Sequence, residues 1–428
     1  MSELTDFYQE QAVAGRSDIA WLAHLQKDAL ADLKRTGFPM RKHEDWKYTS
    51  VEGFLQQRFM NARADTVNAD TSSQTDLPIA CHKIGINNGV VVGADAIAAF
   101  LPPGVVVLPL TQALISHPEK IKPYLGHILK QEHGFHALNT AMLHSGLFVY
   151  LPKGVCLTEP LLLAHWHDQP QHATHLRHLV IAEPGSSACI IEDYQGAPSI
   201  DYFTNAITEI FAAANATVTH YKIQRESKAA FHIGHLAVRQ ASGSQVNSHL
   251  FSFGGKLVRS DVTFALEAPN AQCFMNGIYA PTDGQHMDHH TRVTHAVADC
   301  SSIQDYKGIL SGHSRAVFNG QVIVAKDAQH TSAKQQNKNL LLSVGAEIDT
   351  KPQLEIFADD VVCTHGATVG QLDEDALFYL ATRGIERAEA SQYLVRAFAA
   401  ENIRAVTEAP LAEWLGQLLA SQIGCRHE

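Results

Sequence analysis

Cys363 and His365 are the residues of this 428-residue chain whose types and spacing most directly suggest chemistry. They lie in a stretch of β-forming residues, and the period of a strand places residues i and i+2 on the same face. A thiolate and an imidazole on one face can hold iron, zinc or a sulfur species. Because two side chains do not complete a metal site, further ligands must come from elsewhere in the fold or from a partner. A buried cysteine beside a histidine, with Gly366 making a turn, is the plainer interpretation of the same residues.

A second concentration of potential ligands is the segment QHMDHHTRVTH, residues 285–295, which contains four histidines and Asp288. Imidazole and carboxylate groups suit zinc or iron. Strand alternation, however, sends His289 and His290 to opposite faces and leaves only a partial ligand set on either face. We therefore expect a solvated, hydrogen-bonded row of histidines on the surface. A β-helix enzyme that binds metal through this histidine-rich surface is the alternative function.

The sequence lacks the motifs of several enzyme and metal-binding classes. Its seven cysteines are dispersed and never form Cys-x-x-Cys, which argues against a disulfide framework, a zinc finger or a ferredoxin-type cluster site. Gly254-Gly255-Lys256 resembles the end of a phosphate loop, but Leu257 stands where Ser or Thr would bind magnesium. We therefore expect no ATP hydrolysis by this chain.

Charge and hydropathy indicate where the protein acts. The net charge is −11 and the basic residues are scattered, which removes the electrostatic basis for binding nucleic acid or an anionic membrane. The first residues show no signal-peptide pattern, and there is no run of about eighteen apolar residues of the kind that spans a membrane. These features predict a cytoplasmic protein that binds neither nucleic acid nor membrane.

The elements that must position these residues fall into three regions, of which the first, residues 1–88, is expected to be helical. Behind Ser17, a suitable N-cap, apolar residues recur at every fourth position up to Gly37: Trp21, Leu25, Ala29 and Leu33. The polar stretch 61–76 follows and is expected to be a surface linker.

Residues 89–370 are expected to form the β core. Short runs of Val, Ile, Phe and Tyr alternate with Gly, Asn, Asp and Ser, and only residues 115–144 have a helical character. The turn signals recur at intervals that fall from roughly thirty residues to between about twelve and seventeen, which suits the coils of a parallel β-helix. A β-sandwich is the second choice, but Asn-Gly and Asp-Gly turns are too sparse for its hairpins.

Residues 371–428 are expected to form a C-terminal helical domain of three amphipathic helices. The first begins near Asp373 and ends at Gly384, and the third begins at Pro410. The predicted apolar stripe of the second is Ala390, Leu394, Ala397 and Phe398, and that of the third is Leu411, Leu415, Leu418 and Leu419. Such helices can cover the β core, bind a partner, or do both.

Five motifs, in this order, resemble the SufB/SufD family, the core subunits of the SUF iron–sulfur cluster assembly scaffold. They are HEDWKYTS, HMDHHTRVTH, QQNKNLLLSVGAEIDTKPQLEIFADDV, CTHGATVGQLDEDALFYLATRGI and the helical AxxYLVRAF, and they extend from about residue 40 to 400. The tryptophan in EDWKY, the form CTHGATVG and the chain length favour the SufD branch of the family. This resemblance implies a right-handed parallel β-helix flanked by N-terminal and C-terminal helical regions.

The resemblance also implies partners. A family member of this kind is a scaffold subunit, not an enzyme. It pairs through its β-helix with a SufB-like paralogue, or with itself when isolated. A SufC-like ABC ATPase, which alone binds ATP, is recruited through the C-terminal helices, where Phe378, Tyr379, Arg383 and Tyr393 are candidates by position.

Carried over from the family, Cys363 and His365 match positions at the SufB–SufD interface, where a transient iron–sulfur cluster or iron is held. His365 is then expected to be an iron ligand, and Cys363 a ligand or an auxiliary thiolate. ATP-driven dimerisation of SufC is expected to pull on the terminal helices and open this interface. The family association extends to iron entry and to reduced flavin in the assembled complex, although no flavin motif is legible in this sequence.

Overall fold

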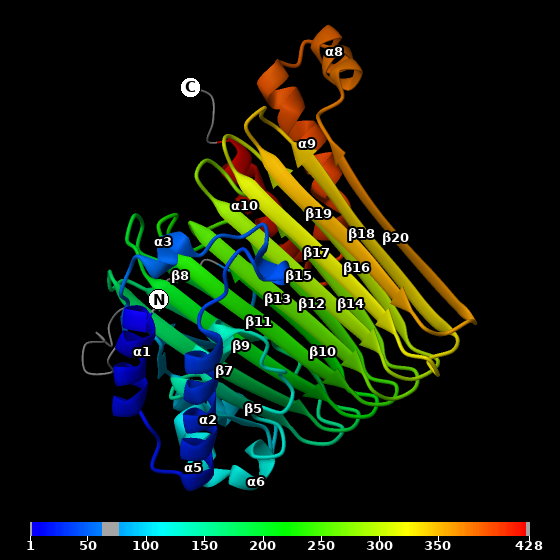
Figure 1. The fold of residues 1–428 in the computed structure, drawn as a ribbon. Coiled ribbons are helices and arrows are strands. Elements are labelled where there is room, and N and C mark those ends of the chain that lie inside the picture. The colour runs from blue at the N-terminus through cyan, green and yellow to red at the C-terminus, as the bar shows by residue number, and fades with distance from the viewer. Residues whose placement is uncertain (1, 62–76, 425–428) are drawn as a thin grey trace.

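The computed structural model describes residues 2–61 and 77–424 and shows a chain that is mainly β. Two sheets lie face to face and run the length of the molecule (Figure 1). The first sheet contains β19 (Glu347–Ile356), β17 (Arg315–Val324), β15 (His286–His295), β13 (Leu257–Leu266), β11 (Phe231–Gln240), β9 (Phe203–Ala212), β7 (His172–Ala182), β5 (Leu147–Leu151) and β4 (Val106–Pro109), and β1 (Met60–Asn61) pairs with β7. The second sheet contains β20 (Val361–Gly370), β18 (Thr331–Leu341), β16 (Ser301–Leu310), β14 (Gln272–Tyr279), β12 (Gln245–Ser252), β10 (Thr217–Gln224), β8 (Ser187–Gly196), β6 (Leu161–His167), β2 (His82–Asn87) and β3 (Val90–Val92).

Successive strands alternate between the sheets, so the chain winds as a parallel β-solenoid. From β6 to β18 every described strand pairs in parallel with the strand two places later in the sequence. This topology confirms the predicted β-helix and excludes the β-sandwich, whose sheets are antiparallel. At one corner of each coil a residue with positive φ turns the chain: Gly185, Asn215, Gly243, Asn270, Asp299 and His330. Gly, Asn and Asp adopt this conformation most readily.

The space between the sheets is filled by alternate side chains of each strand. Val258, Val262 and Phe264 of β13 point into this interior and are fully buried. The interior is not wholly apolar, because Glu192 lies there and accepts hydrogen bonds from Tyr194 and Thr208. The outward residues of both sheets are covered by helices from the two ends of the chain.

The N-terminal region covers the outer face of the first sheet. Its helices are α1 (Ser2–Ala14), α2 (Ala20–Thr36), η1 (Glu44–Trp46) and α3 (Glu52–Leu55). The later helices are α4 (Ala94–Ile97), η3 (Ala98–Phe100), α5 (Leu110–Ser116), α6 (Pro118–Ile121) and α7 (Gly134–Ala141), so residues 115–144 are helical in part, as predicted. The predicted linker lies, apart from Asn61, outside the described residues. β2 starts before the predicted boundary at residue 89.

Two details of α2 differ from the sequence interpretation. The helix begins at Ala20 with Ile19 as its N-cap, because the Ser17 hydroxyl accepts from the Ile19 amide and closes a turn before the helix. The predicted N-cap at Ser17 is therefore wrong. The buried face is Leu22, Gln26, Ala29, Leu30 and Leu33, since α2 packs against both α7 and the sheet, and this leaves Trp21 and Leu25 half-buried at its border.

The C-terminal helices α8 (Glu374–Thr382), α9 (Arg387–Arg404) and α10 (Ala409–Gly424) follow the last strand. α9 and α10 pack on the outer face of the second sheet, whereas α8 stands beyond the end of the sheets (Figure 1). The predicted stripe of α9 is confirmed at Ala390 and at Phe398, which packs against the same cluster, but is wrong at Ala397, which is exposed. The fully buried residues of α9 are Ala390, Val395, Ala399 and Asn402. None of the described helices is long and apolar enough to cross a membrane.

Candidate functional site at the open end of the solenoid

The last coil leaves two sheet edges without a partner strand among the described residues. β19 pairs only with β17 and ends the first sheet, and β20 pairs only with β18 and ends the second. Backbone N–H and C=O groups along such edges are free to bond a strand of another chain. We call this end of the molecule, formed by β19 and β20, the open end.

Cys363 and His365 lie on β20, on the face that continues the solenoid interior. Cys363 is in register with Ala333 of β18, and His365 is in register with Gln335. Ala333 and Gln335 are buried between the sheets, so the two β20 side chains extend the same inward row at a level that no later coil covers. The structure therefore places the two residues on one face, as strand alternation requires, and places Gly366 within the strand instead of in a turn.

The two side chains differ in exposure. Cys363 is half-buried against the apolar cluster of Val322, Val324, Ala328, Ala333 and Ala358, whereas His365 is exposed. Burial raises the pKa of the Cys363 thiol, so at neutral pH this group carries its proton in the isolated chain. A bound cation would favour the thiolate, because metals bind the deprotonated form.

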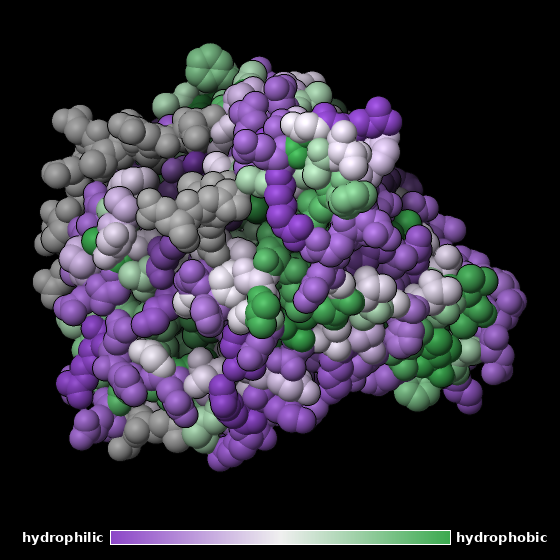
Figure 2. Space-filling view, turned by 90° about the horizontal axis from the view of Figure 1, so that it is seen from above, coloured by the Kyte–Doolittle hydropathy of each residue, from purple (hydrophilic) through white to green (hydrophobic). Residues whose placement is uncertain are grey.

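Large apolar side chains surround the open end. Five of them are exposed on β19, β20 and the adjoining loops: Val344, Ile356, Phe357, Val362 and Val369. In the view from above, hydrophobic residues gather in separate patches on a largely hydrophilic surface (Figure 2). Exposed apolar clusters of this kind mark interaction surfaces.

The partner-binding candidates of the C-terminal helices are exposed. Phe378 and Tyr379 on α8 are 72% and 58% exposed, and Tyr393 on α9 is 45% exposed. The Arg383 guanidinium lies 5.3 Å from the centre of the Tyr379 ring. The paired side chains of Arg387 and Glu374 tie α8 to α9 with bonds of 2.6 and 2.9 Å.

The histidine-rich strand does not form the predicted solvated row. His289 and His295 point into the solenoid and are buried, because the second sheet covers that face of β15. His286 and His290 point outward, where Thr49 bonds both His286 and Asp288. Two groups of three potential metal ligands form among the described side chains, and neither contains a residue of 285–295.

The segment that covers β15 is the HEDWKYTS motif, whose Thr49 bonds the outward side chains of that strand. Trp46 is buried, and the Arg259 guanidinium lies over its ring. Arg259 bonds both Asp261 and Asp288 at 2.7–2.8 Å. Sequence periodicity cannot reveal this contact, because its partners are far apart in the chain and the strand pattern gives no hint of what covers its outer face.

Known families and proteins match this chain over most of its length. A family model for the SufBD core domain of SUF system FeS cluster assembly matches residues 165–398, and one for the SufBD protein N-terminal region matches residues 1–163. The chain belongs to the SufBD family. The predicted resemblance is therefore confirmed, and with it a role in SUF iron–sulfur cluster assembly.

Several SufBD relatives match nearly the whole chain. The iron–sulfur cluster assembly protein SufD of Escherichia coli is 33% identical over 93% of this chain and 91% of its own length. A SufBD family protein of Synechocystis is 30% identical over 98% and 94%, and SufD of Bacillus subtilis is 26% identical over 94% and 93%. The similarity to proteins named SufD agrees with the branch that the motifs favour.

Proposed function

We propose that this SufBD chain is a scaffold subunit, without ATPase activity of its own, in which Cys363 and His365 take part in building the nascent cluster at an interface. The observation that carries the proposal is the position of this pair on a terminal strand with one free edge, facing inward at the uncovered end of the solenoid. A site of two ligands at such an edge is completed when a partner chain supplies the rest.

The partner that best fits the open end is another solenoid of the same family. The free edges of β19 and β20 could each continue into a sheet of a SufB-like paralogue, and the exposed Phe357 and Val362 would be covered by the contact. A second copy of this chain could occupy the same edges when the paralogue is absent.

At that interface His365 would bind iron through a ring nitrogen, and Cys363 would act as a ligand or auxiliary thiolate. The exposed His365 ring is accessible to incoming iron, whereas the half-buried Cys363 thiol loses its proton only when a cation or partner group lowers its pKa. The cluster or iron is cargo in this scheme and leaves with its acceptor.

A SufC-like ABC ATPase is the proposed second partner, and all ATP hydrolysis would belong to it. The supporting feature is the exposed aromatic surface of α8 and α9, which includes Phe378, Tyr379 and Tyr393 beside Arg383. Aromatic and arginine side chains dominate the binding energy of many interfaces. A cytoplasmic location and reduced flavin in the assembled complex are part of the same proposal, with no residue of this chain assigned to flavin.

Cluster reconstitution on the co-expressed three-protein complex tests the proposal. We expect Cys363→Ser and His365→Ala to lose visible absorbance and bound iron while gel filtration shows an intact complex. Matched controls are Cys156→Ser and His24→Ala, since both side chains are exposed at other sites. Full cluster formation in both site variants would overturn the chemical role of the pair and leave the chain a mechanical partner.

A further inference from the structure

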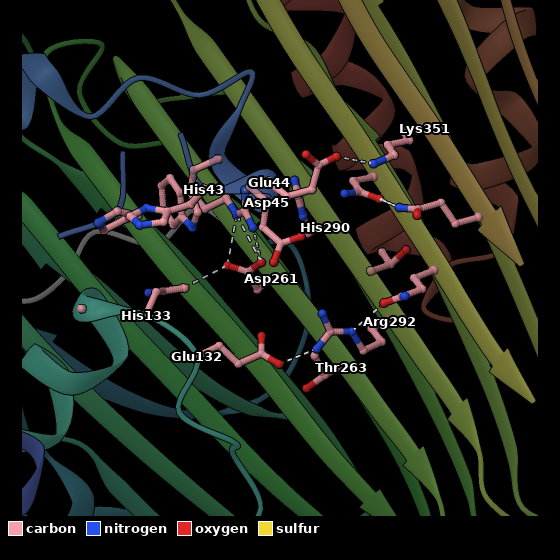
Figure 3. Close-up of a pocket in the computed structure, with 18 of the residues that line it drawn as sticks. His43, Glu44, Asp45, Glu132, His133, Asp261, Thr263, His290, Arg292 and Lys351 are labelled. Carbon is pink, nitrogen blue, oxygen red and sulfur yellow. Dashed lines mark hydrogen bonds and ion pairs between the residues drawn. The ribbon is translucent and has the colours of Figure 1, made fainter. Parts of the chain in front are cut away.

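A pocket of about 580 Å³ lies on the outer face of the first sheet (Figure 3). Its floor consists of outward side chains of β13, β15, β17 and β19, among them Asp261 and His290. Its walls are the segment 36–46 and the residues Glu132 to Gly134 at the start of α7. Strand periodicity does not predict this pocket, because its walls and floor come from distant parts of the chain.

The strand register sets a row of polar side chains beneath α7. His235 of β11, Asp261 of β13 and His290 of β15 occupy matching positions on adjacent strands. His133 and His136 approach this row from the start of α7. One nitrogen of each of these two histidines and one oxygen of Asp261 lie within 4.8 Å of one another.

His133 is buried without the hydrogen bonds that its ring requires. Its side chain is only 10% exposed, and neither Nδ1 nor Nε2 has a hydrogen-bond partner in the part of the chain that the structure describes. Nε2 lies 3.8 Å from Asp261 Oδ2 and points toward it in Figure 3, a distance too long for a hydrogen bond. Buried polar groups are nearly always satisfied. An imidazole that has no hydrogen bond and only a 3.8 Å ion-pair contact with Asp261 can therefore accept a ligand.

His136 is already oriented as a metal ligand would be. Its Nδ1 accepts only a long bond of 3.3 Å from the Glu132 amide, and its Nε2 lies 2.9 Å from His235 Nδ1. His235 Nε2 in turn lies 2.9 Å from Thr263 Oγ1. A proton on each Nε2 satisfies this chain and leaves the His136 Nδ1 lone pair with only the long bond from the Glu132 amide, which a cation would displace. Outer hydrogen bonds such as that to His235 fix the ring of a metal-binding histidine.

The charges around the cluster favour a cation. Arg259 neutralises one of the two buried carboxylates, Asp261 and Asp288, that it bonds. At the mouth of the pocket Glu132 pairs with Arg292, and Glu44 pairs with Lys351 at 2.7 Å (Figure 3). The Asp45 carboxylate adds a further negative charge at the same mouth. The three buried ions Arg259, Asp261 and Asp288 together carry one negative charge.

We propose that His133, His136 and Asp261 bind a divalent first-row transition-metal cation, with the remaining coordination positions open to the pocket. Two imidazoles and one carboxylate are a donor set for Fe²⁺ or Zn²⁺. The second ligand group, His165, His178 and Glu192, is enclosed in the solenoid, and its carboxylate already accepts bonds from Tyr194, Thr208 and His220. The site is independent of Cys363 and His365, which lie on β20 of the other sheet.

Titration of the untagged, metal-free chain with Co²⁺ tests the site, because cobalt reports ligation through its visible spectrum. All samples carry Cys363→Ser and His365→Ala, so that the open end contributes no binding and the result does not depend on the proposed function. We expect one equivalent to bind, and His133→Ala and Asp261→Asn to weaken it by at least about tenfold. The matched control is His313→Ala, since this ring is 89% exposed at another site.

Thermal unfolding gives a second readout that separates a lost ligand from a damaged fold. A cation that binds the native state raises its melting temperature. The parent is the chain that carries only Cys363→Ser and His365→Ala. We expect cobalt or zinc to raise the melting temperature of the parent and of its His313→Ala variant. The melting temperature of the His133→Ala variant should be the same with and without metal. The site would be overturned if the parent showed no cobalt spectrum and no thermal shift. It would also be overturned if His133→Ala showed the same spectrum and the same shift as the parent.

Discussion

The Arg259 guanidinium lies 4.5 Å from the centre of the Trp46 ring and thereby joins the N-terminal segment to the outer face of the first sheet. The same side chain is fully buried and bonds both Asp261 and Asp288. Removing it would leave two buried carboxylates without their counter-ion.

We therefore predict that Arg259→Ala lowers the free energy of unfolding by about 3–5 kcal/mol, the usual consequence of removing one partner of a buried ion pair. Chemical denaturation at neutral pH measures this change. Arg239→Ala is the matched control, because its pair with Glu267 is partly solvated and should contribute about 0–1 kcal/mol. Equal losses in the two variants would contradict the structural role assigned to Arg259.

The glycine pair that resembles a phosphate loop has a structural role. A Cβ on Gly254 would overlap the backbone of Glu226, and Gly255 has a φ of +81°. We predict that Gly254→Ala lowers the free energy of unfolding by about 3–5 kcal/mol, as the larger packing defects do. Gly366→Ala should change it little, since a Cβ on Gly366 meets no atom within 4 Å. Thermal unfolding of both variants tests the difference, and a tolerated Gly254→Ala would show that the corner can relax.

Buried histidines make stability depend on pH. Burial lowers the pKa of His167 to about 4, and those of His175 and His249 to about 3. Above about pH 6.5 these rings are neutral in both the folded and the unfolded chain and contribute no pH dependence. Below it the unfolded chain binds protons that the folded chain does not, so each histidine reduces stability by about 1.4 kcal/mol per pH unit down to its folded pKa.

We expect the free energy of unfolding to be flat above neutrality and to fall steeply between about pH 6.5 and 4. His175→Phe keeps a ring among Tyr8 and Phe203 but removes one titrating group. In this variant the free energy of unfolding should fall less steeply with decreasing pH, by about 1.4 kcal/mol per pH unit. Denaturation curves at several pH values measure both slopes, and identical slopes would mean that His175 is not buried as described.

The sequence predicted the solenoid because each coil repeats the same turn chemistry. Asn215, Asn270 and Asp299 stand at equivalent corners, and their positive φ explains why Asn and Asp recur there. The turn signals of the sequence come closer together toward the C-terminus because residues such as Gly312 turn the chain at the opposite corner of the coil. Once both corners are separated, the coil length is nearly constant.

The candidate sites differed in how far the sequence could define them. Cys363 and His365 share one strand, so alternation alone placed them on one face. The polar row beneath α7 could not be predicted, because His133 and Asp261 meet only through the packing of α7 on the first sheet. The one available signal was the pair His133 and His136, whose spacing at the start of a helix puts both rings on one side. The burial of His289 was missed for the same reason, since the pattern of β15 does not show that both its faces are covered.

The exposed apolar residues of the open end should determine association. Phe357 is 63% exposed and Val362 71% exposed, and both adjoin free sheet edges whose pairing with another solenoid would bury them. We predict that the double variant Phe357→Asp, Val362→Asp no longer self-associates as the isolated chain. Its complex with a SufB-like paralogue should weaken by at least about tenfold. Both effects follow because each new charge would have to be desolvated in the interface. Sedimentation velocity measures the first effect and titration of the paralogue the second.

Phe100→Asp is the matched control, since this ring is 73% exposed in η3, near the other end of the solenoid. If the control weakened association as much as the double variant, the contact would have to lie elsewhere than at β19 and β20.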